Sequence, residues 1–249
     1  MSTLTQTLEQ IERQKALWDA AQPLPASLLE QLREDWEVTQ TYNSNAIEGN
    51  TLTLAETKVI LLHGVTVGGK LLNEHLEVLG HRDAMRLMMR LAQVQQPLEE
   101  SDILELQRVI LSRVQESDAG RYRTVRVRVT GSSRIFPNPV KVPELMGELV
   151  AQINAMLTRA EHPVLIAAAA HFGLVYIHPF ADGNGRTVRL LMNLILLRHG
   201  YPPALLPVTK RLEYYAALEK ANGGHMDDFN QFIAQITLET LQNMVAVVA

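Results

Sequence analysis

Residues 178–189 read His-Pro-Phe-Ala-Asp-Gly-Asn-Gly-Arg-Thr-Val-Arg, and this stretch decides how the rest of the chain folds around it. An apolar run at 164–177 precedes it, and a run with the apolar spacing of a helix follows it at 185–199. Pro179 breaks the first helix, while Gly183 and Gly185 permit a tight loop. We therefore expect two buried helices joined by a loop that is dense in reactive side chains.

The loop carries the groups that binding and activation of a phosphate ester require. The amides at the start of the helix expected at 185–199 point outward with its positive dipole end, which favours an anion. Arg186 and Arg189 lie three residues apart on one helix face, so both guanidiniums can reach one polyphosphate. Asp182 offers a hard oxygen ligand for Mg²⁺, and the His178 imidazole can accept a proton from a hydroxyl at neutral pH. A lone histidine or a lone Gly-x-Gly turn is more often structural, but the combination favours a catalytic loop.

Apolar spacing of three and four residues dominates the rest of the chain, so the sequence predicts a mostly α-helical fold. Two closely spaced prolines end a first amphipathic helix, and Ser27 with Glu30 forms a capping box for a second helix that runs toward Tyr42. Thr53 and Glu56 repeat the capping signal. Further helices are expected at 73–95, 101–116, 143–159, 163–177, 185–199, 211–221 and 228–247.

Residues 123–130 are the exception to the helical spacing. Their sequence, Arg-Thr-Val-Arg-Val-Arg-Val-Thr, places valines on one side and arginines on the other when extended, and a Gly-Ser-Ser turn follows at 131–133. This pattern predicts a short β-hairpin, or flap. The arginines at 121, 123, 126, 128 and 134 also suit a nucleic-acid-binding face, although no aromatic residues are interleaved with them as stacking platforms.

Composition limits the class of protein. The chain has 249 residues, 47% of them hydrophobic, which is enough to bury a sizeable core. A formal net charge of -4 gives no overall attraction to nucleic acid or to an anionic membrane. With no cysteine, the chain forms no disulfide or thiolate metal site, and it suits the reducing cytoplasm. The N-terminus lacks the apolar core of a secretory signal, and the longest apolar run is shorter than the roughly 20 residues that a membrane span needs.

The loop resembles the signature of the Fic family, His-x-Phe-x-(Asp/Glu)-Gly-Asn-Gly-Arg-x-x-Arg, at every specified position from 178 to 189. The resemblance extends from about residue 42 to about residue 240. It includes Gly-Arg-Tyr-Arg at 120–123 and Gly-Tyr-Pro-Pro at 200–203. The chain is similar to bacterial and animal Fic proteins that adenylylate other proteins. We expect one compact unit, with an N-terminal helical region at 1–100 and the Fic core at 101–249.

The resemblance implies that His178 deprotonates a Ser, Thr or Tyr hydroxyl of a target protein, that the hydroxyl attacks the α-phosphorus of ATP, and that pyrophosphate leaves. Asp182 would hold Mg²⁺ on the phosphates, and Phe180 would anchor the loop in the core. The residues that would bind the nucleotide are Gly183, Asn184, Gly185, Arg186 and Arg189 around the phosphates, and Tyr214, Tyr215 and Asn222 around the adenine. Tyrosines on a helix are otherwise typical of a core or an interface.

Residues 44–50, Ser-Asn-Ala-Ile-Glu-Gly-Asn, resemble the inhibitory motif of the family, (Ser/Thr)-x-x-x-Glu-(Gly/Asn). Ser44, Glu48 and Gly49 match its specified positions and Asn50 follows directly, and Gly49 or Asn50 can supply the left-handed turn that ends a helix. The resemblance implies that Glu48 pairs with Arg189, which would otherwise hold the γ-phosphate, so that the enzyme is held off. In some relatives the same glutamate helps water remove AMP from a modified target.

The resemblance also makes the flap a docking edge, at Thr130, Gly131, Ile135 and Phe136, where an extended target segment adds a strand beside the active site. One alternative is a Fic-fold phosphotransferase that binds ATP reversed, a branch that typically carries lysine in place of Gly185. Another is a non-catalytic helical protein that binds nucleic acid. We expect no nucleic acid or membrane partner. The identity of the target, and the choice between a monomer and a homodimer, stay open.

Overall fold

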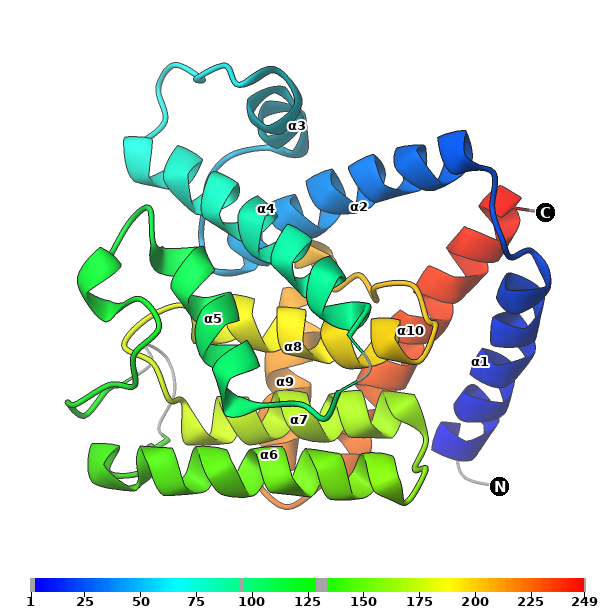
Figure 1. Cartoon of the computed structure of the whole chain (residues 1–249). Helices are drawn as coiled ribbons and strands as arrows, with labels where there is room; N and C mark the ends of the chain where they lie inside the picture. Colours follow the sequence, from blue (N-terminus) through cyan, green and yellow to red (C-terminus); the bar gives the residue numbers. More distant parts are fainter. Residues whose placement is uncertain (1–2, 95, 129–133, 249) are drawn as a thin grey trace.

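The computed structural model describes residues 3–94, 96–128 and 134–248, and regular structure in these ranges is helical throughout (Figure 1). These ranges contain ten α-helices. They are α1 (Thr3–Ala20), α2 (Ala26–Ile47), α3 (Leu54–His63), α4 (Leu72–Ala92), α5 (Glu100–Leu111), α6 (Val142–Thr158), α7 (Pro163–Ile177), α8 (Asn184–Arg198), α9 (Arg211–Asn222) and α10 (Met226–Val248). Short 3₁₀ turns lie at Glu116–Asp118, Pro139–Lys141 and Val208–Lys210. The prediction of a mostly α-helical fold is confirmed.

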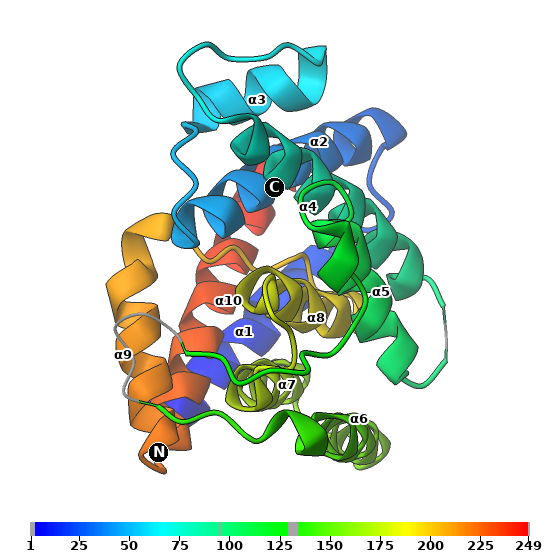
Figure 2. The ribbon, with the colours of Figure 1, turned by 90° about the vertical axis from the view of Figure 1, so that its left-hand side faces the viewer.

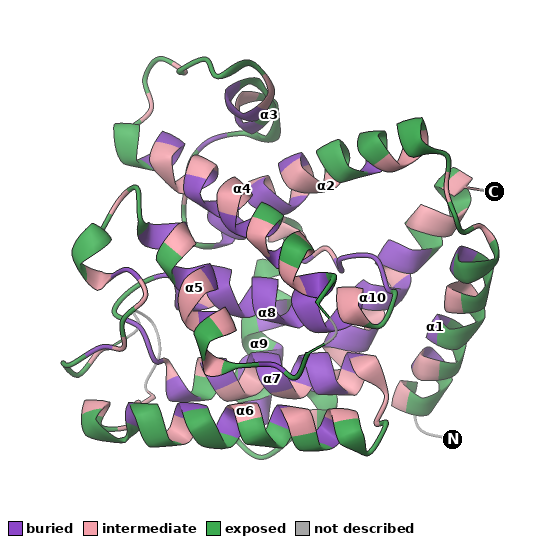
Figure 3. Cartoon of the chain, in the orientation of Figure 1, coloured by how far each residue is buried: buried purple, intermediate pink, exposed green. Residues whose placement is uncertain are grey.

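Helix α8 is the centre of the molecule. Twelve of its 15 residues are buried, and it packs against α2, α4, α5 and α7. Figure 3 shows it as a largely buried helix surrounded by helices with exposed outer faces. Such burial requires apolar residues on several sides of the helix, and the segment Val188–Leu196 supplies them. The loop at 178–189 therefore leads directly into the best-packed element of the fold.

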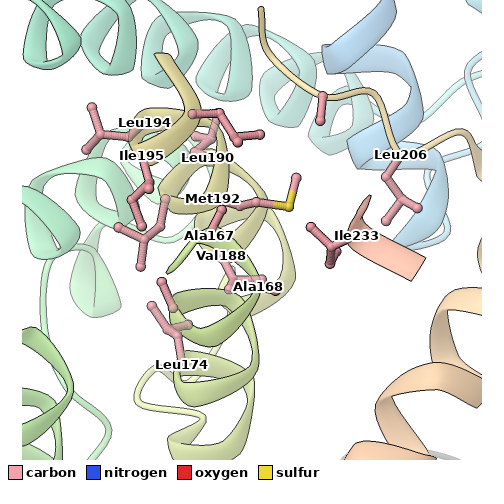
Figure 4. Close-up of a cluster of buried hydrophobic side chains, with 14 of the residues drawn as sticks. Ala167, Ala168, Leu174, Val188, Leu190, Met192, Leu194, Ile195, Leu206 and Ile233 are labelled. Carbon is pink, nitrogen blue, oxygen red and sulfur yellow. The ribbon is translucent and has the colours of Figure 1, made fainter. Parts of the chain in front are cut away.

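The contact between α7 and α8 is built from small residues against large ones. Ala167 and Ala168 of α7 are fully buried, and Val188 and Met192 of α8 lie close to them (Figure 4). Buried residues from nine of the helices join one hydrophobic cluster, and α3 packs on a smaller separate cluster that includes Ile60. Among the described residues, no helix is both long and apolar enough to cross a membrane.

Of the two capping boxes that the sequence predicts, the structure contains one. The Thr53 side chain accepts from the Glu56 N–H at 3.2 Å, and the Glu56 carboxylate accepts from the Thr53 N–H at 2.7 Å, so this capping box is confirmed. The capping box at Ser27 and Glu30 is wrong. Helix α2 starts at Ala26 after Pro25, which puts Ser27 inside the first turn rather than ahead of it. Helix α5 also ends earlier than expected, at Leu111.

The predicted β-hairpin does not form in the part of the flap that the structure describes, residues 121–128 and 134–138. In place of hydrogen bonds between two strands, the side chain of Arg123 connects the two arms. Its guanidinium, on a residue that is only 4% exposed, donates to the backbone oxygens of Val125 at 3.0 Å, Pro137 at 2.7 Å and His178 at 2.7 Å. One side chain thus ties both arms to the loop at 178–189, and Figure 2 shows one arm passing in front of α7 and the other running below it to α6. Residues 129–133, which include Thr130 and Gly131 of the predicted flap, lie outside the described residues.

Helices α4 and α5 approach each other closely at Gly80, and this contact generates a stability prediction. A methyl group on Gly80 would lie 2.6 Å from the backbone oxygen of Ile110. We expect Gly80→Ala to lower the free energy of unfolding by about 1–3 kcal/mol, because the backbone of α5 must move. Urea denaturation measures the difference.

The matched control is Gly147→Ala in α6, where the nearest atom to the added methyl group is a Glu100 side-chain oxygen at 4.0 Å. Here the better helix propensity of alanine should raise the free energy of unfolding by about 0.5–1 kcal/mol. Equal stability of the two variants would show that the α4–α5 contact tolerates a side chain at Gly80.

Candidate active site

The loop begins at His178, which ends α7 in a left-handed conformation with φ 51° and ψ 60°. A non-glycine residue rarely adopts this conformation, so neighbouring contacts must hold it. The backbone oxygen of His178 accepts from Arg123 Nε at 2.7 Å, and its N–H donates to Leu174 O at 2.8 Å. The Phe136 ring packs on the imidazole with 4.3 Å between the ring centroids. These contacts fix where the imidazole sits.

Burial controls the charge of His178. It lowers the pKa of the imidazole to about 4, and the positive charges of Arg123 and Arg134 act in the same direction against the carboxylates of Glu48 and Asp182. The imidazole is therefore neutral at pH 7. Its Nδ1 atom is buried without a hydrogen-bond partner among the described residues. A neutral, unpaired ring nitrogen is the form of histidine that can accept a proton.

The side chain of Asn184 stabilises the loop. Its side chain accepts from the Phe180 N–H at 3.0 Å and donates to the Phe180 oxygen at 2.9 Å. Phe180 is fully buried and stacks on Tyr122 with a centroid distance of 5.8 Å. Both polar atoms of the Asn184 side chain are thus bonded to the loop backbone. Asn184 can still contribute to an anion site through its backbone N–H, because the N–H groups in the first turn of a helix have no partner within the helix.

Glu48 occupies the N-terminal end of α8. Its Oε1 accepts from Arg189 Nη2 at 2.8 Å, and an added Cβ on Gly185 would collide with its carboxylate. Arg189 also donates from Nε to Ser44 Oγ at 2.9 Å and from Nη2 to Ser44 O at 2.8 Å. Gly49, with φ 101°, makes the left-handed turn after α2 that the sequence predicts. The ion pair between Glu48 and Arg189 that the resemblance implies is present, and the Glu48 carboxylate lies where an anion would bind.

Arg186 is held by two carboxylates from different elements. Its Nη2 lies 3.2 Å from Asp182 Oδ2, and its Nη1 lies 3.4 Å from Glu77 Oε1 in α4. Its Nε atom and the Nη1 atom of Arg189 are both buried without a hydrogen-bond partner in the described part of the chain. Buried guanidinium N–H groups without partners, beside a helix N-terminus, fit the oxygens of a phosphate group.

Two buried histidines flank Arg189. Burial and then the charge of Arg189 lower the pKa of both His81 and His171 to about 3. His81 Nδ1 lies 3.1 Å from Thr41 Oγ1, and His171 Nε2 lies 2.8 Å from the Tyr214 hydroxyl. Both rings are therefore neutral packing partners, which leaves the positive charge of this region on the two arginines of α8.

The three residues proposed for the adenine do not share one environment. Tyr214 is 2% exposed, and its hydroxyl is bound by His171, so the structure does not present this ring to a ligand. The reason is that residue 214 faces inward on α9. Tyr215, which is 40% exposed, and Asn222 lie seven residues apart on the outer face of α9. The Arg211 guanidinium lies 5.6 Å from the centroid of the Tyr215 ring.

A metal site made from protein ligands alone is not seen in the described ranges, which contain no group of three His, Asp or Glu residues placed for one. Mg²⁺ does not need such a group, because it is usually bound by one or two carboxylates together with phosphate oxygens and water. The Asp182 side chain is 52% exposed, and Arg186 and the Gly183 N–H contact its oxygens. This open carboxylate beside the anion site fits a shared Mg²⁺ ion.

Sequence reasoning missed Glu77 and misplaced Arg123, which it assigned to an exposed face. Glu77 belongs to no motif, so only the packing of α4 over α8 brings it to Arg186. For Arg123, the sequence did contain a clue, because the residue belongs to the Gly-Arg-Tyr-Arg segment at 120–123 that resembles the family. Of the flap residues, Phe136 lies against His178 and Ile135 is 88% exposed.

Comparison with known proteins identifies the family. The model of the Fic/DOC family matches residues 97–196. A Drosophila grimshawi protein named protein adenylyltransferase Fic is 44% identical over 202 residues, which are 80% of this chain and 41% of that protein. The structure of Fic-1 from C. elegans is 36% identical with a TM-score of 0.86, over 98% of this chain and 73% of that one. A Fic-domain signalling protein from Bacteroides thetaiotaomicron superposes with a TM-score of 0.90 at 29% identity, over 96% and 97% of the two chains.

The fold is therefore that of the Fic domain, an all-helical domain built around a helix-loop-helix. The chain belongs to the Fic family, as its resemblance to the family signature indicated. It spans only about two fifths of the length of the curated relatives, 40% of the Caenorhabditis briggsae protein adenylyltransferase fic-1 and 41% of the Drosophila protein.

The charge state of His178 can be measured directly. We expect its imidazole to stay neutral at pH 6, where an unperturbed histidine is about three-quarters protonated. Its NMR signals, assigned by their loss in His178→Ala, should titrate only as the pH falls toward about 4. A midpoint at 6.5 or above would contradict the effect of burial described here.

Proposed function

We propose that the chain transfers AMP from ATP to a hydroxyl group of a target protein and that Glu48 holds this activity off. The observation that carries the proposal is the set of groups at the loop: a neutral imidazole, a helix N-terminus at which the Glu48 carboxylate lies, and two buried guanidiniums with unpaired N–H groups. Relatives named protein adenylyltransferase, at 40–44% identity, support it.

In the proposed reaction, His178 takes the proton of the target hydroxyl, and the hydroxyl oxygen forms a bond to the α-phosphorus of ATP. The bond from that phosphorus to the bridging oxygen breaks, and pyrophosphate leaves with the electron pair. Arg186, Arg189 and the first amides of α8 bind the phosphates, which lowers the barrier mainly by positioning and by charge stabilisation. Asp182 would hold Mg²⁺, which when bound offsets negative charge on the phosphates.

The alternatives are less well supported by the same geometry. Residue 185 has no room for a lysine, because a side chain there meets Glu48 and Arg189, which argues against the phosphotransferase branch. Arg123 is buried, so it is not available to a nucleic-acid-binding face on the flap. Arg134 lies over the Tyr176 ring, 4.0 Å from its centroid.

Glu48 supports a second candidate activity, the removal of AMP from a modified protein. Its negative charge acts to raise the pKa of His178, which supports the two groups lying within electrostatic range of each other. In this second activity Glu48 would orient a water molecule as the nucleophile. Lysate proteins labelled by a Glu48→Gly variant, freed of that variant and then incubated with the wild type, would lose their label if this activity is present. Label that persists argues for transfer alone.

The principal test is incorporation of label from ATP carrying a labelled α-phosphate into lysate proteins. We expect Glu48→Gly to label at least about 100 times faster than the wild type, because it frees Arg189 from a competing pair whose removal is equivalent to about 3 kcal/mol. Glu48→Gly combined with His178→Ala is the control and should not label. Label from γ-labelled ATP instead would show phosphate transfer, and unchanged labelling by Glu48→Gly would exclude the inhibitory role.

A graded test uses Ser44, whose hydroxyl accepts from Arg189 Nε. We expect Ser44→Ala to activate only about fivefold, because it removes one hydrogen bond to the guanidinium while the bond to the Ser44 backbone oxygen remains. Thr39→Ala on the same helix is the matched control, since the Thr39 hydroxyl bonds to the Asp35 backbone at 2.7 Å and not to Arg189. Equal rates for the two variants would separate Ser44 from the inhibitory contact.

A further inference from the structure

A cavity of about 630 Å³ lies between α1, α2, α4 and the turn that follows α8. None of its lining residues belongs to the loop at 178–189 or to the segment at 44–50. Its volume falls within the roughly 300–1,000 Å³ typical of small-molecule sites. The cavity is thus separate from the candidate active site and large enough for a ligand of its own.

Two helix faces across the cavity carry flat rings and guanidiniums. On α2, Arg33 and Trp36 lie on one face, and on α4, Arg86 and Arg90 are four residues apart and line the same space. Trp18, at the end of α1, adds a second indole. Indole and guanidinium planes both stack on aromatic rings, and guanidiniums also bind carboxylates and phosphates.

The positive charge of the lining is not balanced. Arg86 is bound by Glu37, with both N···O distances at 2.7 Å. Asp19, the acidic residue of the lining, is bound by Lys15 at 2.6 Å. Arg33 and Arg90, by contrast, make no salt bridge with any residue that the structure describes. Two guanidiniums are therefore available for an anion.

Trp36 supplies an independent indication of a ligand. Its indole Nε1 is buried and has no hydrogen-bond acceptor among the described residues. A buried indole N–H usually finds a partner, because leaving it unpaired has an energetic cost. An oxygen atom of a bound molecule would provide the acceptor.

We propose that this cavity binds a small planar aromatic anion. The ring packs against the indoles of Trp18 and Trp36, and a carboxylate, sulfonate or phosphate group binds Arg33 and Arg90. The proposal does not depend on the transfer reaction. Helix α2 does connect the two sites, because Glu48 directly follows its last residue and lies about 18 Å along the chain from Trp36 at 1.5 Å per residue.

The chain contains two tryptophans, and both line the cavity, so a ligand bound there lies next to every tryptophan of the chain, and the arginine variants described below test whether the signal comes from this site. The probe is 8-anilinonaphthalene-1-sulfonate, an aromatic sulfonate that accepts energy from excited tryptophan. We expect saturable energy transfer in the full chain. Arg33→Gln and Arg90→Gln should each weaken binding about tenfold, since each removes a charge-assisted contact.

Arg13→Gln is the matched control, because it removes the same charge from an exposed position of α1 that does not line the cavity. It should bind the probe as the wild type does. Equal unfolding temperatures of the three variants would establish that each is folded. Binding by Arg33→Gln and Arg90→Gln that is as tight as binding by Arg13→Gln would overturn the proposal, as would the absence of energy transfer in the wild type.

Displacement of the probe defines the ligand chemistry. Naphthalene-2-carboxylate should displace it at least tenfold more strongly than naphthalene-2-carboxamide, which has the same ring without the charge. AMP as a third competitor distinguishes two classes of ligand. If AMP displaces the probe as well as the carboxylate does, the ligand is a nucleotide. If only the carboxylate displaces it, the ligand is an aromatic acid. An amide that competes as well as the carboxylate would rule out an anion site.

Discussion

A guanidinium buried in the core needs partners, and the arrangement around Arg189 follows from that requirement. Its side chain is 5% exposed, at the middle of the most buried helix. Ser44 and Glu48, from α2, satisfy two of its nitrogen atoms. Burial, and then the charge of Arg189, lowers the pKa of His81 and of His171, so both rings are neutral. The end of α2 is thus held in place by the bonds that Ser44 and Glu48 make to one cation.

The catalytic loop could be predicted from the sequence because its information is local. The break at Pro179, the glycines at 183 and 185 and the flanking apolar runs all lie within one continuous stretch, and the observed bounds of α7 and α8 agree with the expected ones to within one residue. The Glu48–Arg189 pair is not local. It followed only from resemblance to a family in which the two motifs occur together.

Other features could not be predicted, for reasons of packing. Alternating arginines and valines indicate an extended, exposed segment, but Arg123 is buried because the backbone oxygens of the loop and of both flap arms converge on it. Tyr214 and Tyr215 are adjacent in sequence and differ only in which side of α9 each faces. Glu77 contacts Arg186 through the crossing of α4 over α8, and no pattern within α4 encodes that crossing.

The proposed inhibition has a consequence for stability that follows from the same burial. If Glu48 were absent, Arg189 would keep its bonds to Ser44 but lose its only carboxylate partner in the described structure. Removing one partner of a fully buried pair costs about 3–5 kcal/mol, and the cost here is smaller because the Glu48 side chain is 36% exposed. A bound polyphosphate would return a negative charge to the guanidinium and recover that stability in proportion to its binding. In the proposed mechanism, Glu48 and the ATP phosphate would thus be alternative counterions for one buried cation, and the contact proposed to inhibit transfer would also stabilise the fold in the absence of nucleotide.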